Sequence, residues 1–128
     1  MAETPTDLSY TANHEWVRVS GTVARVGVTD YAAQMIGDVV YVSLPTPGTT
    51  VVTGDSCAEL ESTKSVNDVY APVAGVIKAV NQAIEDAPET INSDPYGDGW
   101  LFDIEMSGDE PSDLLDASAY TDMLGSDG

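Results

Sequence analysis

Basic residues are scarce in this chain. Lysine and arginine total four among 128 residues, against 22 aspartates and glutamates, which gives a formal net charge of −18 at pH 7. Such a charge repels nucleic acid and anionic membranes, so we expect neither as a partner. The acids are spread along the chain, which indicates either adaptation to high salt, where self-repulsion is screened, or docking to basic enzymes.

Cysteine and histidine occur only once each. Cys57 cannot form an internal disulfide, and its apolar neighbours predict a small packed side chain. His14 lacks the second histidine of a zinc-binding helix, and no segment resembles a nucleophile elbow or a phosphate-binding loop. We therefore expect no catalytic residues and no metal site, and we expect any chemistry to come from a group attached to the protein.

Long hydrophobic runs are also missing, although apolar residues make up 42% of the chain. No segment reaches the length that spans a membrane, and residues 1–7 lack the basic and apolar parts of a secretory signal. We expect a cytoplasmic protein. The length suits a single domain over residues 1–128, with a core at about 9–106 and a helical segment at about 111–125.

Short runs of β-forming residues, separated by turn residues, fill most of the chain. They predict strands over residues 16–20, 22–27, 38–44, 57–60, 69–73, 76–80 and 100–105. Many short, evenly spaced strands indicate a mostly β fold, a small sandwich or barrel. The large aromatic side chains are expected in its core: Trp16, Tyr41, Trp100 and Phe102.

Helix signals are fewer. Thr29-Asp30 and Gly37 predict the start and the end of a short helix over residues 31–36. Residues 82–85 are expected to form one helical turn, and residues 92–99 are typical of turns. From Ser112 onward the apolar spacing predicts one or two amphipathic helices.

Lys64 lies in a polar turn between two strand-like runs, residues 57–60 and 69–73. This pattern predicts that the lysine stands at the tip of a β-hairpin, where a modifying enzyme can reach it. Lys78 lies on the next strand, without the acids and glycines that surround Lys64. We expect it to be an ordinary solvated lysine.

Seven short motifs follow one another along nearly the whole chain. They occupy residues 14–17 (HEWV), 27–32 (GVTDYA), 37–42 (GDVVYV), 44–48 (LPTPG), 61–64 (ESTK), 68–75 (DVYAPVAG) and 92–101 (NSDPYGDGWL). Together and in this order they resemble the glycine cleavage H-protein family, which are lipoyl carriers. Thr63 and Ser65 depart from the Val and Ala frequent in that family, but Thr63 is β-branched and nearly isosteric with Val.

This resemblance implies a barrel-sandwich hybrid of the lipoyl and biotinyl carrier type, with two sheets related by a pseudo-twofold and with C-terminal helices. Lipoic acid would be attached covalently to the side-chain nitrogen of Lys64, which Gly48 and Gly75 frame. The chain would be a carrier and not an enzyme. It would shuttle the aminomethyl group of glycine from a pyridoxal-phosphate decarboxylase (P protein) to a tetrahydrofolate-dependent aminomethyltransferase (T protein), and dihydrolipoamide dehydrogenase (L protein) would reoxidise it.

The resemblance also points to a surface cleft for the loaded arm. Its amine is expected to be cationic, and a buried charge needs a partner. Glu15 is the leading residue for that role, with Asn13 and Asp68 as hydrogen-bond acceptors nearby. The alternative is that Glu15 is an ordinary exposed acid and that Asp68 is a turn residue.

Three other functions stay open. A biotinyl carrier shares the fold, but its modified lysine normally lies between two methionines, whereas Thr63 and Ser65 flank Lys64. An H-like protein that relays lipoate to other carriers would need the same lipoylated lysine. The last alternative is an unmodified acidic scaffold. For the carrier we expect a monomer that meets its enzymes, including the one that lipoylates it, in brief encounters.

Overall fold

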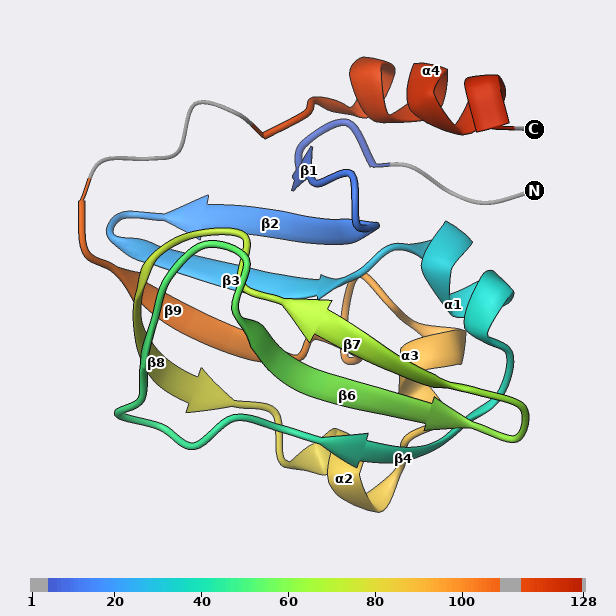
Figure 1. Ribbon diagram of the computed structural model, residues 1–128, viewed down its shortest axis with the longest axis horizontal. Coiled ribbons are helices and arrows are strands. Elements are labelled where there is room, and N and C mark those ends of the chain that lie inside the picture. The colour runs from blue at the N-terminus through green and yellow to red at the C-terminus, as the bar shows by residue number, and fades with distance from the viewer. Residues whose placement is uncertain (1–4, 109–113, 128) are drawn as a thin grey trace.

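The computed structural model describes residues 5–108 and 114–127, and it consists mainly of two antiparallel sheets (Figure 1). The larger sheet has the strand order β1-β2-β3-β9-β8-β5, with β1 Ser9–Tyr10, β2 Glu15–Ser20, β3 Val23–Val28, β9 Phe102–Met106, β8 Gly75–Val80 and β5 Thr50–Val51. The smaller sheet has the order β4-β6-β7, with β4 Val39–Ser43, β6 Ser56–Ser62 and β7 Val66–Tyr70. The expected mostly β, two-sheet fold is confirmed.

One hydrophobic core joins the two sheets. Alternation along the strands turns apolar side chains inward: Leu60 of β6 and Val69 of β7 meet Ile77 of β8 and Ile104 of β9, all of them at most 2% exposed. The sheets contain six and three strands, and the pseudo-twofold between two halves stays a prediction. Because the core fixes both sheets, the β6–β7 hairpin is held firmly at its base.

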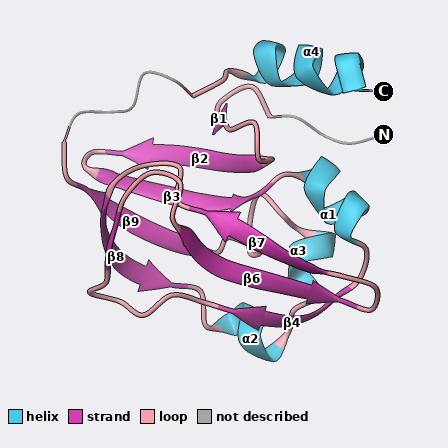
Figure 2. Ribbon diagram, viewed as in Figure 1, coloured by secondary structure: helices cyan, strands magenta, loops and turns pink. Residues whose placement is uncertain are grey.

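Short helices lie around the sheets (Figure 2), namely α1 Asp30–Ile36, α2 Ala83–Asp86, α3 Thr90–Ser93 and α4 Ala117–Asp127. The predicted ends of α1 are confirmed: the Thr29 hydroxyl accepts the backbone N–H of Ala32, and Gly37 ends the helix with φ of 87°. Helix α3 was not predicted. Residues 111–113 of the expected C-terminal helical segment lie outside the described residues.

Within the described residues, no helix has both the length and the apolar character that crossing a membrane requires.

A second, smaller core attaches α4 to the edge of the larger sheet. It consists of Leu8, Tyr10, Trp16, Ala117 and Tyr120. The rings of Tyr10 and Tyr120 stack with centroids 4.8 Å apart, and Tyr10 also pairs with Leu115 through two backbone hydrogen bonds of 2.7 Å. The C-terminal helix is thereby fixed beside the start of β2.

The aromatic predictions hold for two of the four residues. Trp16 and Phe102 are fully buried. Tyr41 was wrongly placed in the core, since it is 60% exposed: a register shift between Val39 and Tyr41 turns Val40 and Tyr41 outward in succession. Trp100 is half-buried.

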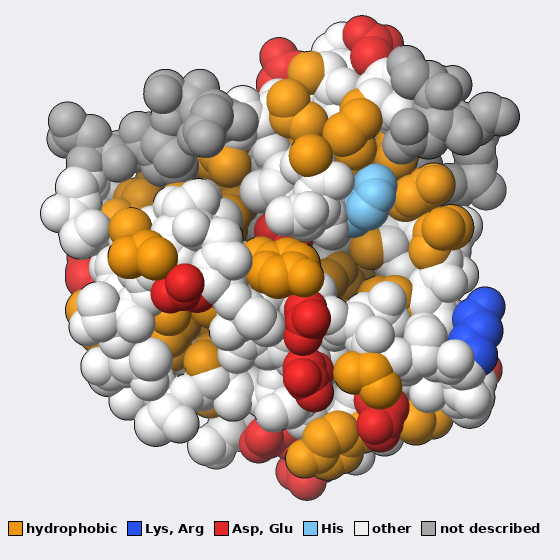
Figure 3. Space-filling model, in the orientation of Figure 1, with side chains coloured by type: hydrophobic (Ala, Val, Ile, Leu, Met, Phe, Trp, Pro, Cys, Tyr) orange, Lys and Arg blue, Asp and Glu red, His pale blue; other side chains and the backbone are white. Residues whose placement is uncertain are grey.

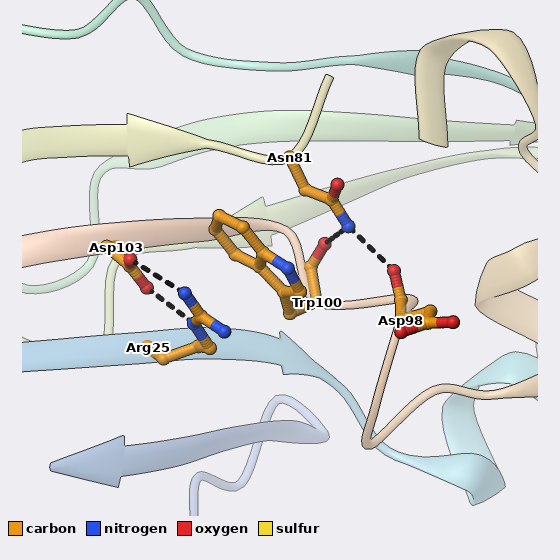
Figure 4. A network of polar contacts seen from close by, with 5 residues as sticks. All are labelled: Arg25, Asn81, Asp98, Trp100 and Asp103. Atoms are coloured by element: carbon orange, nitrogen blue, oxygen red, sulfur yellow. Dashed lines mark hydrogen bonds and ion pairs between the residues drawn. The ribbon is translucent and has the colours of Figure 1, made fainter. Parts of the chain in front are cut away.

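Trp100 is covered by a polar network (Figure 4). The Arg25 guanidinium lies 3.9 Å from the centroid of the Trp100 ring and binds both carboxylate oxygens of Asp103. On the other side, the side-chain amide of Asn81 donates to the carbonyls of Asp98 and Trp100. Trp100 therefore packs partly against the second core and partly against an arginine.

Candidate functional site

Lys64 stands at the tip of the β6–β7 hairpin, as the sequence predicts. Ser62 and Ser65 close the turn, with the N–H of Ser62 donating to the carbonyl of Ser65 at 2.8 Å. Lys64 is exposed. Arg25 pairs with Asp103 and Lys78 with Glu105, whereas Lys64 has no ion pair to any described residue. Its amine is therefore open to an approaching enzyme.

The side chain of Ser62 shapes this turn. It is 6% exposed, and its hydroxyl accepts the backbone N–H groups of Lys64 at 3.2 Å and of Ser65 at 3.1 Å. A serine that bonds the backbone two and three residues ahead mimics a backbone turn. Sequence reasoning assigned no role to Ser62, because a serine in a polar loop is common and its partners are visible only in three dimensions.

The lysine side chain runs toward the end of α1. A Cβ atom built on Gly37 would lie 3.2 Å from Cε and 3.7 Å from Nζ of Lys64. Gly37 also has φ of 87°, which a residue with a side chain rarely adopts. Glycine is required here by its own conformation, and its lack of a side chain leaves room for the lysine.

A cleft of about 390 Å³ opens between α1, the start of β2 and β7. One part of its lining is apolar and comes from β3, α1 and β7: Val28, Ala32, Met35, Ile36 and Val69. The other part is polar or aromatic: Asn13, His14, Glu15, Tyr31, Asn67 and Asp68. Lining residues Met35 and Ile36 directly precede Gly37, so one end of the cleft lies next to the Lys64 side chain.

Glu15 is buried at the base of this cleft with 2% of its surface exposed. Its carboxylate accepts the backbone N–H of Tyr70 at 2.7 Å and the hydroxyl of Thr11 at 2.9 Å. Burial raises the pKa of Glu15 to about 7, although both hydrogen bonds act in the opposite direction. The expectation of an ordinary exposed acid is wrong, and a titratable carboxyl group faces a partly apolar cavity.

The structure brings all three sequence-predicted acceptors to this cleft. Asn13 and Asp68 are exposed at its rim, and Asp68 also accepts a hydrogen bond of 3.2 Å from the Ser56 hydroxyl. His14, for which no role was predicted, also lines the cleft and has φ of 68°. Figure 3 shows His14, the only histidine of the chain, beside a recess lined by hydrophobic side chains.

Asn92 supports the part of the cleft wall that α1 forms. Its side-chain amide donates to the carbonyls of Gly37 at 2.8 Å and Ala33 at 3.3 Å, and its oxygen accepts the N–H of Val39 at 2.9 Å. These bonds satisfy the C-terminal end of α1 and join it to the start of β4. This role of Asn92 was not predicted, because its partners are 53 to 59 residues away in the sequence.

Other chemistry-bearing groups lie outside this arrangement. Burial, together with the nearby carboxylates of Asp55 and Glu15, raises the pKa of the Cys57 thiol to about 11, so it stays protonated near neutral pH. Cys57 is half-buried against the core, in keeping with its predicted packing. Over residues 5–108 and 114–127, no three side chains of the metal-binding types are grouped to hold an ion.

Comparison with known proteins gives consistent results. A family model described as "Glycine cleavage H-protein" matches residues 8–127. The "Glycine cleavage system H protein" of Beutenbergia cavernae is 57% identical over 116 residues, covering 91% of this chain and 92% of that protein. The protein of the same description from Nocardia farcinica is 53% identical, with 98% of this chain and 99% of that protein covered. The crystal structure of a glycine cleavage system H protein from Mycobacterium marinum superposes with a TM-score of 0.88 at 46% identity, covering 94% of this chain and 98% of that one.

Proposed function

Since this chain belongs to the glycine cleavage H-protein family, we propose that Lys64 is the residue to which its lipoyl group is attached. The observation that supports this is the exposed hairpin tip, where Lys64 is presented without an ion pair to any described residue. Lys78, the other lysine of the chain, is 3.7 Å from Glu105 within the larger sheet. Only Lys64 combines a turn, an open approach and an adjoining cleft.

The protein is the lipoyl carrier of the glycine cleavage system and serves as a shared substrate rather than a catalyst. When attached, the lipoyl group would supply a disulfide that is reduced as one of its sulfur atoms takes up the aminomethyl unit of glycine, and dihydrolipoamide dehydrogenase would reoxidise the resulting dithiol once the unit has left. The residues of this chain present that group, shelter its cargo and release it. A rigid hairpin suits the first task, because the attachment point stays fixed while the arm remains free.

We infer that the cleft shelters the cargo, with Glu15 as its ionic partner. A volume of about 390 Å³ with an apolar wall fits a short alkyl chain. The Glu15 carboxylate uses one lone pair on each oxygen for Tyr70 and Thr11, which leaves lone pairs for a cationic amine. An amine in the cleft would stabilise the ionised form of Glu15, so binding of the cargo and deprotonation of this carboxyl support each other.

The exposed Asn13 and Asp68 supply acceptors at the rim of the cleft. Asp68 adds a second negative charge near the proposed position of the amine. Its exposure makes this contribution weaker than that of Glu15, because water screens it.

Membership of the system implies three partners, the glycine decarboxylase, the aminomethyltransferase and dihydrolipoamide dehydrogenase, and we propose a lipoylating enzyme as a fourth. Figure 3 shows acidic side chains at several separate places on the face in view, and the net charge is −18. We propose that basic surfaces of these enzymes are attracted to that face in brief encounters. A cytoplasmic monomer fits this role, because three enzymes must reach the same lysine in turn.

The test is the intact mass of the chain from its native host, followed by peptide mapping. We expect one lipoyl adduct, located on Lys64. The Lys64→Arg variant should lose the adduct, and the matched Lys78→Arg variant should keep it. A biotinyl adduct would assign the protein to carboxylation chemistry. A Lys64 that stays unmodified after incubation with lipoate and a lipoylating enzyme would contradict the proposal.

Lipoate relay predicts the same adduct, so a second assay separates it from glycine cleavage. The lipoylated chain is incubated with a glycine decarboxylase and glycine, and release of CO2 is measured. Turnover that depends on Lys64 supports glycine cleavage. Transfer of the lipoyl group to other carriers, without CO2 release, would favour the relay.

A further inference from the structure

Tyr120 reaches from the C-terminal helix α4 into the wall of the cleft. It is fully buried, and its hydroxyl lies 2.8 Å from Nδ1 of His14 and 2.8 Å from Oγ1 of Thr29. These partners are 106 and 91 residues away in the sequence. One oxygen atom of α4 therefore joins the segment that leads into β2 to the segment that leads into α1.

Each of the two partners positions a different wall of the cleft. His14 lines the cleft and directly precedes Glu15. Thr29 caps α1 by accepting the N–H of Ala32, and Ala32 lines the cleft as well. The carbonyl of His14 also accepts the N–H of Thr29 at 3.0 Å. The two walls thus meet at a small group of hydrogen bonds centred on the Tyr120 hydroxyl.

The backbone of His14 needs such support. Its φ of 68° lies in the left-handed region, and among the described residues other than glycine no other has a positive φ. Histidine tolerates this conformation better than most residues, yet it still costs free energy and persists where the surroundings fix it. The next residue, Glu15, is 2% exposed, and its carboxylate is bonded to Tyr70 and Thr11. Holding the His14 ring therefore also holds the direction of the Glu15 side chain.

A neighbouring tyrosine separates the effect of the hydroxyl from that of ring packing. Tyr10 stacks on Tyr120 and is equally buried, but its hydroxyl donates to the carbonyl of Pro5, away from the cleft. Both rings anchor α4 to the larger sheet. Of the two hydroxyls, that of Tyr120 is bonded to residues of the cleft wall.

We propose that Tyr120 is a positioning residue for the cleft: its hydroxyl fixes His14 and Thr29, and so keeps Glu15 and α1 in the arrangement that retains the aminomethyl-loaded arm. The inference rests on the proposed role of the cleft. It assigns to α4 a part in cargo retention, in addition to its packing against β1 and β2. Lys64 lies on the β6–β7 hairpin, so attachment of the lipoyl group does not depend on Tyr120.

The first experiment compares Tyr120→Phe with Tyr10→Phe, since each removes one buried hydroxyl from the same stacked pair. For the fully lipoylated protein we measure the half-life of the aminomethyl-loaded form, and for the unmodified chain the rate of lipoylation. We expect Tyr120→Phe to shorten the half-life about fivefold, as the loss of one buried hydrogen bond allows. The half-life of the loaded form of Tyr10→Phe should stay within about twofold of that of the parent. The rate of lipoylation should be unchanged in both variants.

The ring of His14 provides a direct structural readout. Because the chain has a single histidine, its imidazole nitrogens give unambiguous ¹⁵N NMR signals in an untagged, labelled sample. Tyr120→Phe should shift the Nδ1 resonance, and Tyr10→Phe should leave it in place. Unchanged Nδ1 signals in Tyr120→Phe, or equal half-lives for the two variants, would overturn the inference.

A double-mutant cycle separates loss of the hydrogen bond to His14 from a general loss of structure in Tyr120→Phe. His14→Asn retains a residue suited to the left-handed conformation but removes the ring nitrogen. Because the Tyr120 hydroxyl also bonds Thr29, Tyr120→Phe should still shorten the half-life in the His14→Asn background, but by less than it does in the parent. Additive effects would contradict the inference. If the loaded parent decays as fast as free aminomethyl-dihydrolipoamide, the cleft gives no shelter, and the proposed role of the cleft fails instead.

Discussion

The Glu15 carboxylate accepts the backbone N–H of Tyr70 at 2.7 Å, and this bond joins β2 of the larger sheet to β7 of the smaller one. A charged group at such a junction costs free energy unless its hydrogen bonds compensate. Here two donors, Tyr70 and Thr11, meet the carboxylate, and the pKa of Glu15 is still raised to about 7. The fold therefore tolerates the carboxylate at a cost to its own stability, and this cost can be measured.

Glu15→Gln should remove a pH dependence of stability. Between the ordinary pKa of 4.5 and the folded value of about 7, the folded chain binds more protons at Glu15 than the unfolded chain does. The contribution of Glu15 is therefore fully present below pH 4.5 and is lost as the pH rises through 7. A shift of this size corresponds to about 3 kcal/mol. Urea unfolding at a series of pH values should show Glu15→Gln gaining stability relative to the parent over this interval.

The matched control for that experiment is Glu59→Gln, which removes an exposed acid from β6. Its free energy of unfolding should change with pH in the same way as that of the parent over the same interval. If the free energy of unfolding of Glu15→Gln also changes with pH as that of the parent does, the pKa of Glu15 is not raised.

Removal of the same carboxyl should shorten the life of the loaded carrier. We expect Glu15→Ala to speed loss of the aminomethyl group, because the cationic amine would be left without its partner in the cleft. Lipoylation of Lys64, on a separate hairpin, should proceed at the parental rate. The loaded form is followed by mass spectrometry over time, and equal lifetimes for variant and parent would refute the role of Glu15.

Ser62→Ala should loosen the tip that presents Lys64. The variant loses the acceptor for two backbone N–H groups, which should cost about 1–2 kcal/mol and lower the rate of lipoylation severalfold. Ser56→Ala, at the exposed start of the same strand, is the matched control and should change neither quantity appreciably. An unchanged lipoylation rate in Ser62→Ala would show that the turn holds without its side chain.

Asn92→Ala should destabilise the wall of the cleft formed by α1. Three hydrogen bonds disappear, two of them to carbonyls near the end of the helix, and we expect a loss of about 2–3 kcal/mol in urea unfolding. Ser93→Ala is the control, since that side chain is exposed and makes a single long contact of 3.5 Å. Equal stabilities of the two variants would show that the Asn92 bonds contribute nothing.

Added salt should stabilise the protein. With a net charge of −18 the folded chain repels itself, and the screening length falls from about 10 Å at 0.1 M to about 3 Å at 1 M. We expect the melting temperature to rise by roughly 5 °C between 0.1 and 1 M KCl, which corresponds to about 1 kcal/mol. A melting temperature that is flat over this range would contradict adaptation to high salt.

Local chemistry predicted much of this fold. The cap at Thr29, the stop at Gly37 and the turn around Lys64 depend on residues within a few positions of one another, so their signals survive in the sequence. Tyr41 was misplaced because four consecutive β-formers, Val39 to Val42, show no alternation, and the bulge that turns two of them outward has no local mark.

The supporting contacts of the site were beyond sequence reasoning for a different reason. Asn92 and Tyr120 act through hydrogen bonds to residues 53 to 106 positions away, and one polar side chain carries no periodicity that points to such a partner. The burial of Glu15 was hidden as well, since an acid at the start of a strand normally faces water.

The turn around Lys64 depends on contacts that are local in the sequence, whereas the cleft depends on contacts between distant segments. The bonds of the Ser62 hydroxyl around Lys64 lie within residues 62–65, whereas the residues that line or support the cleft come from elements that include β2, β3, α1, β7 and α4. If Lys64 and the cleft have the roles proposed above, a substitution far from the hairpin can change how long a cargo survives while the place of attachment stays the same. The rate at which the carrier is lipoylated and the rate at which it loses its aminomethyl group to water could then change independently of each other.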